Sequence, residues 1–361
     1  MSARHWLSQI ARLPLHQTLS IMNVCGGHER TIAAAGMRSL LPENIRLIPG
    51  PGCPVCVCPE ASIQFAIRLS EQPSITLVSF GDMLRVPANN RKQANNSLLE
   101  SRASGNRVLA VASPLDVVKL ARERPRQLFV FFVAGFETTL APIAAMLAQG
   151  LPDNVKLLVA ARKTWRVVEH LLYSPENKLD ALIAPGHVAS VMGANEWRFI
   201  TDKYKKPCAV SGFNESSMLA AIYSVGRQFV ENEVFLDNCY SDVVSDKGNE
   251  SAKKLIEKYF EVSDARWRGI GVVKHSGFFL RKKYQSINAE YYFDELHGSL
   301  NGSSSKEMPA GCDCARVVLG KILPSECRLY NKACTPSQPV GPCMVSDEGA
   351  CHIWQANETL F

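Results

Sequence analysis

The sequence predicts an α/β protein made of two similar parallel-sheet domains and a small cysteine-rich unit. Three observations predict it: short apolar runs alternate with helical patterns, glycine-containing loops follow six of these runs, and half of the twelve cysteines lie in the last fifty residues. Short buried strands that alternate with helices are typical of βαβ units, whose parallel sheets are covered on both faces. The chain has 361 residues, 46% of them hydrophobic, which is enough for two or three domains.

An amphipathic helix is predicted within residues 1–17, because Trp6 and Ile10 stand among polar residues. We expect this helix to pack with the C-terminal domain. Eight apolar runs follow and are predicted to be strands: Leu19–Val24, Ile45–Ile48, Ile75–Phe80, Val108–Ala112, Leu128–Val133, Val155–Ala160, Ala181–Ala184 and Cys208–Val210. Helices predicted between them include Ala61–Leu69, Leu115–Ala121 and Thr139–Leu147. The strands divide into two sets of four, which predicts one domain over residues 18–125 and a second over residues 126–284.

Residues 285–361 are predicted to form a linker and a cysteine-rich domain. The stretch from Gln285 to Pro309 is polar, and Asn301-Gly-Ser-Ser-Ser-Lys is its most flexible part. The domain that follows has little regular periodicity and few large apolar residues. We therefore expect a bound metal to hold it together.

Composition and charge argue against several classes of protein. The net charge of +6 is small for this length, and Arg122-Glu-Arg-Pro-Arg is interpreted as a solvated helix end, so no nucleic-acid partner is expected. No apolar run has the length of a membrane span, and Arg4, His5 and Arg12 interrupt the region where a signal peptide has its apolar core. We expect a cytoplasmic protein, in which clustered cysteines bind metal or do redox chemistry more often than they form structural disulfides.

Unusual residues follow six of the predicted strands. The loops begin Cys25-Gly-Gly-His-Glu-Arg, Pro49-Gly-Pro-Gly-Cys-Pro, Gly81-Asp-Met-Leu-Arg-Val-Pro, Ala134-Gly-Phe-Glu-Thr-Thr, Pro185-Gly-His-Val and Ser211-Gly-Phe-Asn-Glu. In open parallel sheets, ligands bind beyond the carboxyl ends of the strands. We therefore expect all six loops to line one cleft, with Asp82, Glu137 and His187 among its candidate catalytic residues.

The first two loops carry three thiols. Cys25 precedes two glycines and His28, at the start of a helix predicted over Glu29–Leu41. A thiol at a helix N-terminus ionises more readily, and its thiolate is both a nucleophile and a soft metal ligand. Cys53 and Cys56 form Cys-Pro-Val-Cys, whose spacing permits a reversible disulfide or two metal ligands and does not choose between them.

The tail carries six cysteines: Cys312, Cys314, Cys327, Cys334, Cys343 and Cys351. A structural zinc site usually has two close pairs of ligands, and only Cys312 and Cys314 are close in the sequence. Dispersed thiolates among prolines favour an iron–sulfur cluster, with zinc or unliganded thiols as the alternatives. A cluster or a zinc ion takes four cysteine ligands and six cysteines are available, so spacing alone does not identify the ligands.

Seven motifs together resemble the HypD family of hydrogenase maturation factors. They are Cys25-Gly-Gly-His-Glu, Gly50-Pro-Gly-Cys-Pro-Val-Cys, Phe80-Gly-Asp-Met-Leu-Arg-Val-Pro, Gly135-Phe-Glu-Thr-Thr, Ala184-Pro-Gly-His-Val, Trp267-Arg-Gly-Ile-Gly-Val and Glu348-Gly-Ala-Cys. They follow the order and spacing of the family over most of the chain, and the second motif together with the tail cysteines is highly specific. The resemblance implies two Rossmann-like domains around a cleft and a third domain with a 4Fe-4S cluster. The cluster ligands that it implies are Cys314, Cys327, Cys334 and Cys351.

The resemblance also implies a function. The family works with the small chaperone HypC as the scaffold on which the Fe(CN)2CO group of NiFe hydrogenases is assembled, and cyanide comes from the HypE–HypF pair. By this implication Cys25 holds the iron together with a thiolate of the partner, and His28 lies close enough to hydrogen-bond cyanide or the thiolate. Cys53 and Cys56 would be redox-active. The chain would then be a redox-active assembly scaffold rather than a conventional turnover enzyme.

Four positions depart from the usual pattern of the family. Arg30 stands where a second histidine is usual, Asn214 and Glu215 replace a usual Glu-Pro, and Cys58 is an additional thiol. Arg30 could supply a cation near bound cyanide, but a guanidinium cannot ligate a metal or shuttle a proton at neutral pH. The alternatives to a hydrogenase maturation factor are an iron–sulfur thiol–disulfide reductase and a divergent paralogue that serves no hydrogenase.

Overall fold

The computed structural model describes residues 1–89, 94–298 and 307–357. All eight predicted strands are present: β1 (Leu19–Asn23), β2 (Ile45–Pro49), β3 (Ile75–Phe80), β4 (Val108–Val111), β5 (Leu128–Gly135), β6 (Val155–Arg162), β7 (Ala181–Pro185) and β8 (Cys208–Ser211). Three further strands are β9 (Leu236–Asn238), β10 (Phe260–Trp267) and β11 (Gly271–Leu280). The sequence pattern missed the first because it is short. It missed the other two because they form a hairpin in which exposed polar residues interrupt the apolar ones.

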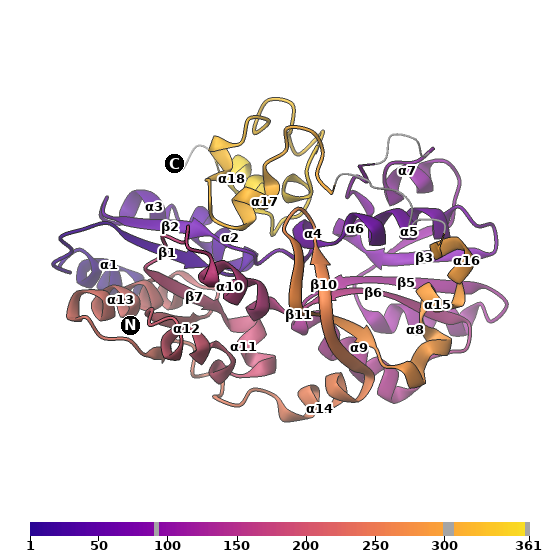
Figure 1. Cartoon of the computed structure of the whole chain (residues 1–361), viewed down its shortest axis with the longest axis horizontal. Helices are drawn as coiled ribbons and strands as arrows, with labels where there is room; N and C mark the ends of the chain where they lie inside the picture. The colour runs from indigo at the N-terminus through magenta and orange to yellow at the C-terminus, as the bar shows by residue number, and fades with distance from the viewer. Residues whose placement is uncertain (90–93, 299–306, 358–361) are drawn as a thin grey trace.

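The strands form two sheets that lie side by side (Figure 1). Sheet A is parallel, with the strand order β2-β1-β7-β8-β9, and sheet B has the order β10-β11-β6-β5-β3-β4. Four strands of sheet B are parallel, and the β10–β11 hairpin joins them in antiparallel fashion. The predicted α/β class is thus confirmed.

The sheets do not follow the predicted division of the chain near residue 125. The chain leaves sheet A after β2, builds β3 to β6 in sheet B, returns to sheet A for β7 to β9, and ends with β10 and β11 in sheet B. Periodicity within a segment identifies a strand. It does not identify the partner strand, because pairing depends on residues that are far apart in the sequence.

Helices and apolar clusters cover both faces of each sheet. The helices up to the end of sheet A are α1 (Ala3–Ile10), α2 (Gly26–Ala34), α3 (Met37–Leu40), α4 (Pro54–Val57), α5 (Glu60–Ser70), α6 (Gly81–Leu84), α7 (Leu98–Ala103), α8 (Pro114–Glu123), α9 (Glu137–Gln149), α10 (Thr164–Tyr173), α11 (Gly186–Met192), η1 (Ala194–Trp197), α12 (Arg198–Asp202) and α13 (Glu215–Glu231), and α14 (Glu250–Tyr259) precedes the hairpin. The single helix predicted over Glu29–Leu41 is divided into α2 and α3. The reason is Gly36, whose φ of 58° lies in the left-handed region that ends a helix.

The N-terminal helix α1 packs against α13, and not with the C-terminal domain as we expected. Ile10 is fully buried in the apolar cluster on one face of sheet A, and the Trp6 ring lies 5.4 Å from the ring of Tyr223 on α13. An apolar stripe shows that a helix covers a surface but does not specify which surface.

The cysteine-rich tail lies over the junction of the two sheets (Figure 1). Its elements are short: α17 (Cys314–Val318), η3 (Pro324–Glu326), η4 (Pro342–Met344) and α18 (Ala350–Ala356). It has no separate apolar core, because its buried residues share one cluster with α4, α5 and one face of sheet B. The preceding linker contains η2 (Lys282–Ile287), α15 (Ala289–Tyr292) and α16 (Asp294–Gly298), and its most flexible predicted part, residues 301–306, lies outside the described residues.

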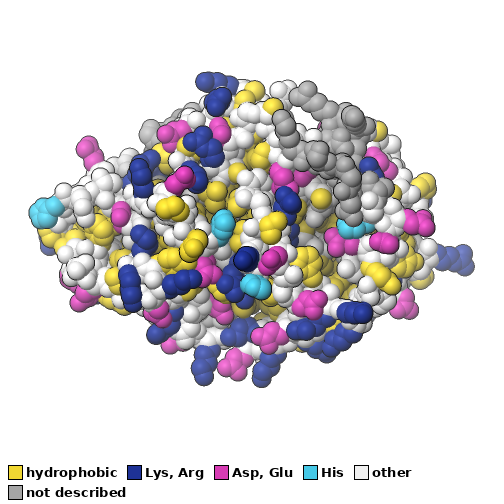
Figure 2. All heavy atoms as spheres, viewed as in Figure 1, with side chains coloured by type: hydrophobic (Ala, Val, Ile, Leu, Met, Phe, Trp, Pro, Cys, Tyr) yellow, Lys and Arg dark blue, Asp and Glu magenta, His cyan; other side chains and the backbone are white. Residues whose placement is uncertain are grey.

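The surface carries charges of both signs. Figure 2 shows Lys and Arg interspersed with Asp and Glu over one face of the molecule, without the single-sign patch that is typical of a nucleic-acid interface. Over the part of the chain that the structure describes, no helix has the length and apolar character needed to cross a membrane.

Arg268, just after β10, is a buried hub between the sheets and the tail. Its side chain is fully buried and forms an ion pair with the buried Glu60 on α5, at 2.7 Å between Nη2 and Oε2. The same guanidinium donates to the carbonyl oxygens of Pro87 (2.9 Å) and Glu307 (3.1 Å). The backbone N–H of Arg268 donates to the carbonyl oxygen of Val57 (3.0 Å). Arg268 therefore holds four segments in one arrangement.

We predict that Arg268→Ala destabilises the protein by about 3–5 kcal/mol, because it leaves the carboxylate of Glu60 buried without its cation. The matched control is Arg266→Ala. The Arg266 side chain is 55% exposed and lies 3.6 Å from Glu307, so its loss should cost less than about 1 kcal/mol. Urea unfolding of both variants measures the difference, and equal midpoints would show that the buried ion pair does not stabilise the fold.

Candidate functional site

A pocket of about 140 Å³ lies where the carboxyl ends of strands from both sheets meet the tail. It is lined by Val24, Cys25, Gly52, Pro54, Phe136, Thr138, Thr139, Thr164, Pro185, His187, Val188 and Glu348. Four of the six predicted loops therefore line it, namely those after β1, β2, β5 and β7. The loops after β3 and β8 do not, while the loop after β6 contributes Thr164 and the tail contributes Glu348.

Cys25 lies where three segments of backbone approach one another closely. The Gly26 N–H donates to the Gly52 carbonyl at 3.3 Å, and a Cβ atom on Gly52 would lie 2.3 Å from the Cα atom of Cys25. A Cβ atom on Gly26 would lie 2.4 Å from the Cβ atom of Glu348. Glycine is required at both positions, because any side chain would separate the loop after β1 from the loop after β2 or from the tail.

Burial changes the acid–base chemistry of Cys25. Burial first, and then the nearby carboxylate of Glu348, raise the pKa of Cys25 to about 12, although the backbone N–H groups of His28 and Gly27 favour the thiolate. Cys25, although partly exposed, is therefore not the easily ionised thiol that we expected. The N-terminus of α2 does act in the expected direction, but desolvation by the surrounding segments outweighs it.

Two histidines contact the Phe213 ring. His187, at the rim of the pocket, stacks on Phe213 with ring centroids 3.6 Å apart, and His28 lies 4.9 Å from the same ring. His28 is fully buried, and its Nε2 donates to the carbonyl oxygen of Ser211 at 3.1 Å. Burial lowers the pKa of His28 to about 4 and also lowers that of His187, so His28 is neutral at physiological pH.

The predicted catalytic carboxylates position other segments and do not line the pocket. Glu137, fully buried at the start of α9, accepts hydrogen bonds from the Thr164 N–H (2.8 Å) and hydroxyl (2.7 Å), and so joins the loops after β5 and β6. Burial raises the pKa of Glu137. Asp82 on α6 accepts a hydrogen bond of 2.8 Å from the Ser346 hydroxyl of the tail.

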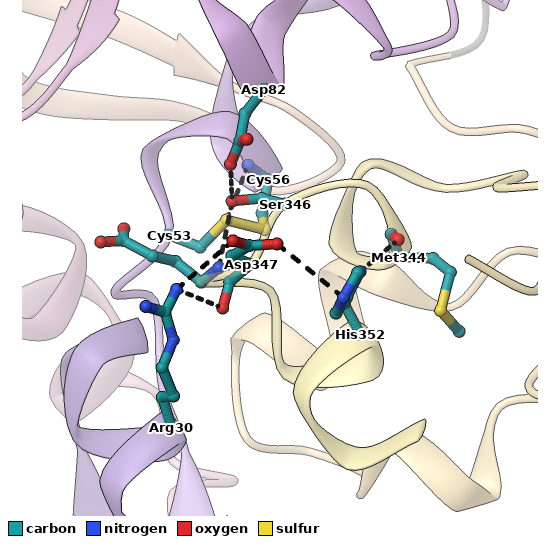
Figure 3. Close-up of a disulfide and its surroundings, with 9 residues drawn as sticks. Arg30, Cys53, Cys56, Asp82, Met344, Ser346, Asp347 and His352 are labelled. Atoms are coloured by element: carbon teal, nitrogen blue, oxygen red, sulfur yellow. Dashed lines mark hydrogen bonds and ion pairs between the residues drawn. A yellow bond between two sulfur atoms is a disulfide. The ribbon is translucent and has the colours of Figure 1, made fainter. Parts of the chain in front are cut away.

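Cys53 and Cys56 are joined by a disulfide at α4. Figure 3 shows that this disulfide lies beside Ser346, so the loop after β2 contacts both the Cys25 loop and the tail. Cys58, the additional thiol, is buried close by, and burial raises its pKa to about 12. Cys58 is therefore a neutral thiol at physiological pH.

The six tail cysteines lie together in one small volume. The Cys314 thiol is within hydrogen-bond reach of those of Cys312, Cys343 and Cys351. Cys334 and Cys327 lie near one another and close enough to this group to act on it electrostatically. The structure thus brings together the four predicted ligands with Cys312 and Cys343.

The donor set of the tail fits a thiolate-bound metal centre. Five of the six cysteines are buried, and a Cβ atom on Gly341 would lie 2.4 Å and 2.6 Å from the sulfur atoms of Cys312 and Cys314. Within the described residues, no three His, Cys, Asp or Glu side chains surround a point where a single metal ion would sit. The six tail cysteines form an all-sulfur donor set, which can hold an iron–sulfur cluster or a zinc ion.

Arg30 is not among the residues that line the pocket, but its positive charge acts on Cys25 and Glu348, which do line it. Its Nη2 donates to the carbonyl oxygen of Asp347 at 3.0 Å and lies 3.9 Å from the Asp347 carboxylate (Figure 3). The side chain is 54% exposed. Arg30 therefore contacts the tail, one residue before Glu348.

Sequence reasoning missed Glu348 and Thr164 as pocket residues. Glu348 stands in the motif that ends at Cys351, but nothing in the sequence brings the tail to Cys25. Thr164 follows β6 without a glycine or a thiol to mark its loop. The geometry adds both to the site.

We predict that Glu348→Gln accelerates alkylation of Cys25 in the metal-free protein. The Glu348 carboxylate raises the pKa of Cys25, so its neutral replacement lowers that pKa and increases the thiolate fraction at pH 8. A roughly threefold or larger increase in rate is expected, since one pKa unit is about tenfold in thiolate. Iodoacetamide labelling of the Cys25 peptide, followed by mass spectrometry, measures the rate. Glu250→Gln, on exposed α14, is the control, and equal rates in all three proteins would contradict the effect of Glu348.

Comparison with known proteins identifies the family of this chain. The family model described as "HypD: Hydrogenase formation hypA family" matches residues 1–358. The chain is 39% identical to a putative hydrogenase expression/formation protein of Methanocaldococcus jannaschii, over 93% of this chain and 91% of that protein. It is 37% identical to the hydrogenase maturation factor HypD of Escherichia coli, over 96% and 90% of the two chains, and 37% identical to HypD of Rhizobium leguminosarum, over 91% and 86%. The chain therefore belongs to the HypD family of hydrogenase maturation factors.

Proposed function

We propose that this chain is a hydrogenase maturation factor that holds iron at Cys25 while cyanide and carbon monoxide are added to it. The observation that carries the proposal is the position of the partly buried Cys25 in a small pocket, where both sheets, the disulfide loop and the tail meet. A volume of about 140 Å³ suits one iron with a few diatomic ligands and is too small for a nucleotide. The family of the chain supports the same assignment.

Cys25 would bind the iron as a thiolate, a soft ligand suited to a metal that also carries cyanide and carbon monoxide. Because the pKa of Cys25 is about 12, iron binding has to release its proton. Glu348 and His187 line the same pocket and are the described groups that can accept or orient that proton. His28 would act through Phe213 and the Ser211 carbonyl rather than as a ligand.

The disulfide and the tail would supply redox chemistry. Reduction of Cys53–Cys56 takes two electrons and two protons and leaves two thiols beside the pocket. A 4Fe-4S cluster held by Cys314, Cys327, Cys334 and Cys351 would exchange electrons one at a time when it is bound. The apolar cluster that contains both the disulfide and these cysteines keeps water out of the region between them.

The proposed partners are a HypC-type chaperone, which would supply a second thiolate to the iron, and a HypE-type cyanide donor loaded by HypF. Thiols that have to stay reduced until they bind metal suit the cytoplasm. The chain would work as an assembly scaffold, with the Fe(CN)2CO group as its cargo.

We predict that Cys25→Ser abolishes the bound iron and its diatomic ligands. Serine keeps the size of the side chain but replaces a soft ligand with a hydroxyl that is hardly ionised. Infrared spectra of wild type and variant, each co-expressed with a HypC-type partner, should show metal-cyanide and metal-carbonyl bands in the wild type only. Equal bands in both proteins would remove Cys25 from the mechanism. Bands absent from both would favour the thiol–disulfide reductase or a paralogue without a hydrogenase client.

The metal centre of the tail has a separate test. Anaerobically purified protein should show the broad visible absorption of an iron–sulfur cluster, which Cys327→Ala and Cys334→Ala should remove and Cys25→Ser should leave intact. Cys343→Ala is the informative comparison, because Cys343 lies within reach of Cys314 and Cys351 without being a proposed ligand. Retained absorption in Cys343→Ala is expected, and its loss would place Cys343 among the ligands.

A further inference from the structure

The buried carboxylate of Glu29 joins the tail to the helix that begins beside Cys25. Glu29 is 2% exposed and directly follows His28 on α2. One carboxylate oxygen, Oε1, accepts a hydrogen bond of 2.6 Å from the indole N–H of Trp354 on α18 of the tail. The other, Oε2, accepts from the Asn23 amide at 2.9 Å and from the Arg38 guanidinium at 3.0 Å.

Breaking only some of these hydrogen bonds costs free energy, because it leaves buried polar groups without partners. A buried carboxylate needs a cation and hydrogen-bond donors, and a buried indole N–H needs an acceptor. Arg38 supplies the cation and also lies over the Trp354 ring, at 4.8 Å from its centroid. Undocking the tail removes one donor from Glu29 and at the same time deprives Trp354 of its acceptor.

The contact lies at one end of the tail segment that closes the pocket. Hydrogen bonds that hold the segment from Ser346 to Trp354 include Ser346 to Asp82, Arg30 to the Asp347 carbonyl, and Trp354 to Glu29. Between them lie Glu348, which lines the pocket, and Cys351, one of the tail thiols. Among these hydrogen bonds, the one between Trp354 and Glu29 is buried on both sides, whereas the bond to Asp82 is partly buried and the bond from Arg30 is exposed.

We propose that Glu29 and Trp354 form a latch through which the metal-dependent fold of the tail controls access to Cys25. With the latch closed, Glu348 stays against Gly26 and limits access to Cys25, which is only partly buried. When the tail loses its metal and unfolds, the latch opens, Glu348 leaves the pocket wall, and Cys25 becomes exposed. Glu29 is a positioning residue in this scheme, since it acts through the tail and does not touch the iron. The proposal rests on the proposed function only in taking the tail as a metal-binding unit.

The test is the rate at which Cys25 is alkylated with and without the metal of the tail. Full-length protein, purified anaerobically without the partner, is labelled with iodoacetamide before and after treatment with a chelator, and the Cys25 peptide is quantified by mass spectrometry. In the wild type, metal removal should accelerate labelling about tenfold. In Trp354→Phe, which keeps an aromatic ring but loses the N–H donor, labelling should already be several-fold faster with metal bound, and chelation should add little.

The matched control is Trp197→Phe. Trp197 is fully buried beside sheet A, and its indole N–H has no hydrogen-bond partner among the described residues, so this variant loses ring volume without losing such a contact. It should behave like the wild type. If Trp354→Phe fails to retain the iron–sulfur absorption, Glu29→Gln serves instead, because it removes the buried charge from α2 and leaves the tail sequence unchanged.

A variant that retains the metal and labels at the wild-type rate, with the wild-type response to chelation, would overturn the latch. So would a wild-type rate that does not change when the metal is removed. Neither result depends on assembly of the Fe(CN)2CO group, because the labelling experiment uses no cyanide, carbon monoxide or partner. The infrared test of the proposed function and the labelling test of the latch can therefore give independent results. Metal-cyanide bands could be present although the latch is disproved, or absent although the latch is supported.

Discussion

The close approach of three backbone segments at Cys25 is the constraint on which the site depends. Gly26 and Gly52 have no side chain because Glu348 and the Cys25 backbone fill the space that a Cβ atom would need. The loop after β1, the loop after β2 and the tail must therefore assemble together. The chain passes between the two sheets three times, so neither sheet is built from one continuous stretch of the sequence. No single part of the chain could therefore form the pocket alone.

The same packing sets the protonation of the site. The N-terminus of α2 favours a thiolate at Cys25, but burial and the carboxylate of Glu348 have the larger effect and keep the thiol protonated. A neutral thiol resists alkylation and oxidation, because the thiolate is the reactive form. A metal can still displace the proton, because the free energy of forming the metal–sulfur bond compensates for deprotonation of the thiol. Under the proposed function, Cys25 would stay protonated until iron binds to it.

The sequence predicted what local patterns determine. The eight buried strands were recognisable as apolar runs, and the glycine- and thiol-containing loops were correctly placed at their carboxyl ends. The exchange of strands between the sheets, the β10–β11 hairpin and the docking of α1 on α13 depend on contacts between distant residues, which local periodicity does not record. The site divides in the same way. Cys25 and His187 were found from their loops, whereas Glu348 enters the pocket only because the tail folds over Gly26.

The docking of the tail combines two kinds of interaction with different roles. Its apolar residues share a cluster with α4 and sheet B, and such burial is strong but non-directional, so it would tolerate a small shift of the tail. Buried polar contacts do not tolerate a shift, because a displaced donor and acceptor are both left unsatisfied. Glu29 therefore fixes the position of Trp354 in a way that apolar packing cannot. Since Glu348 lies six residues before Trp354 on the same segment, the wall of the Cys25 pocket takes its position from a hydrogen bond made outside the pocket.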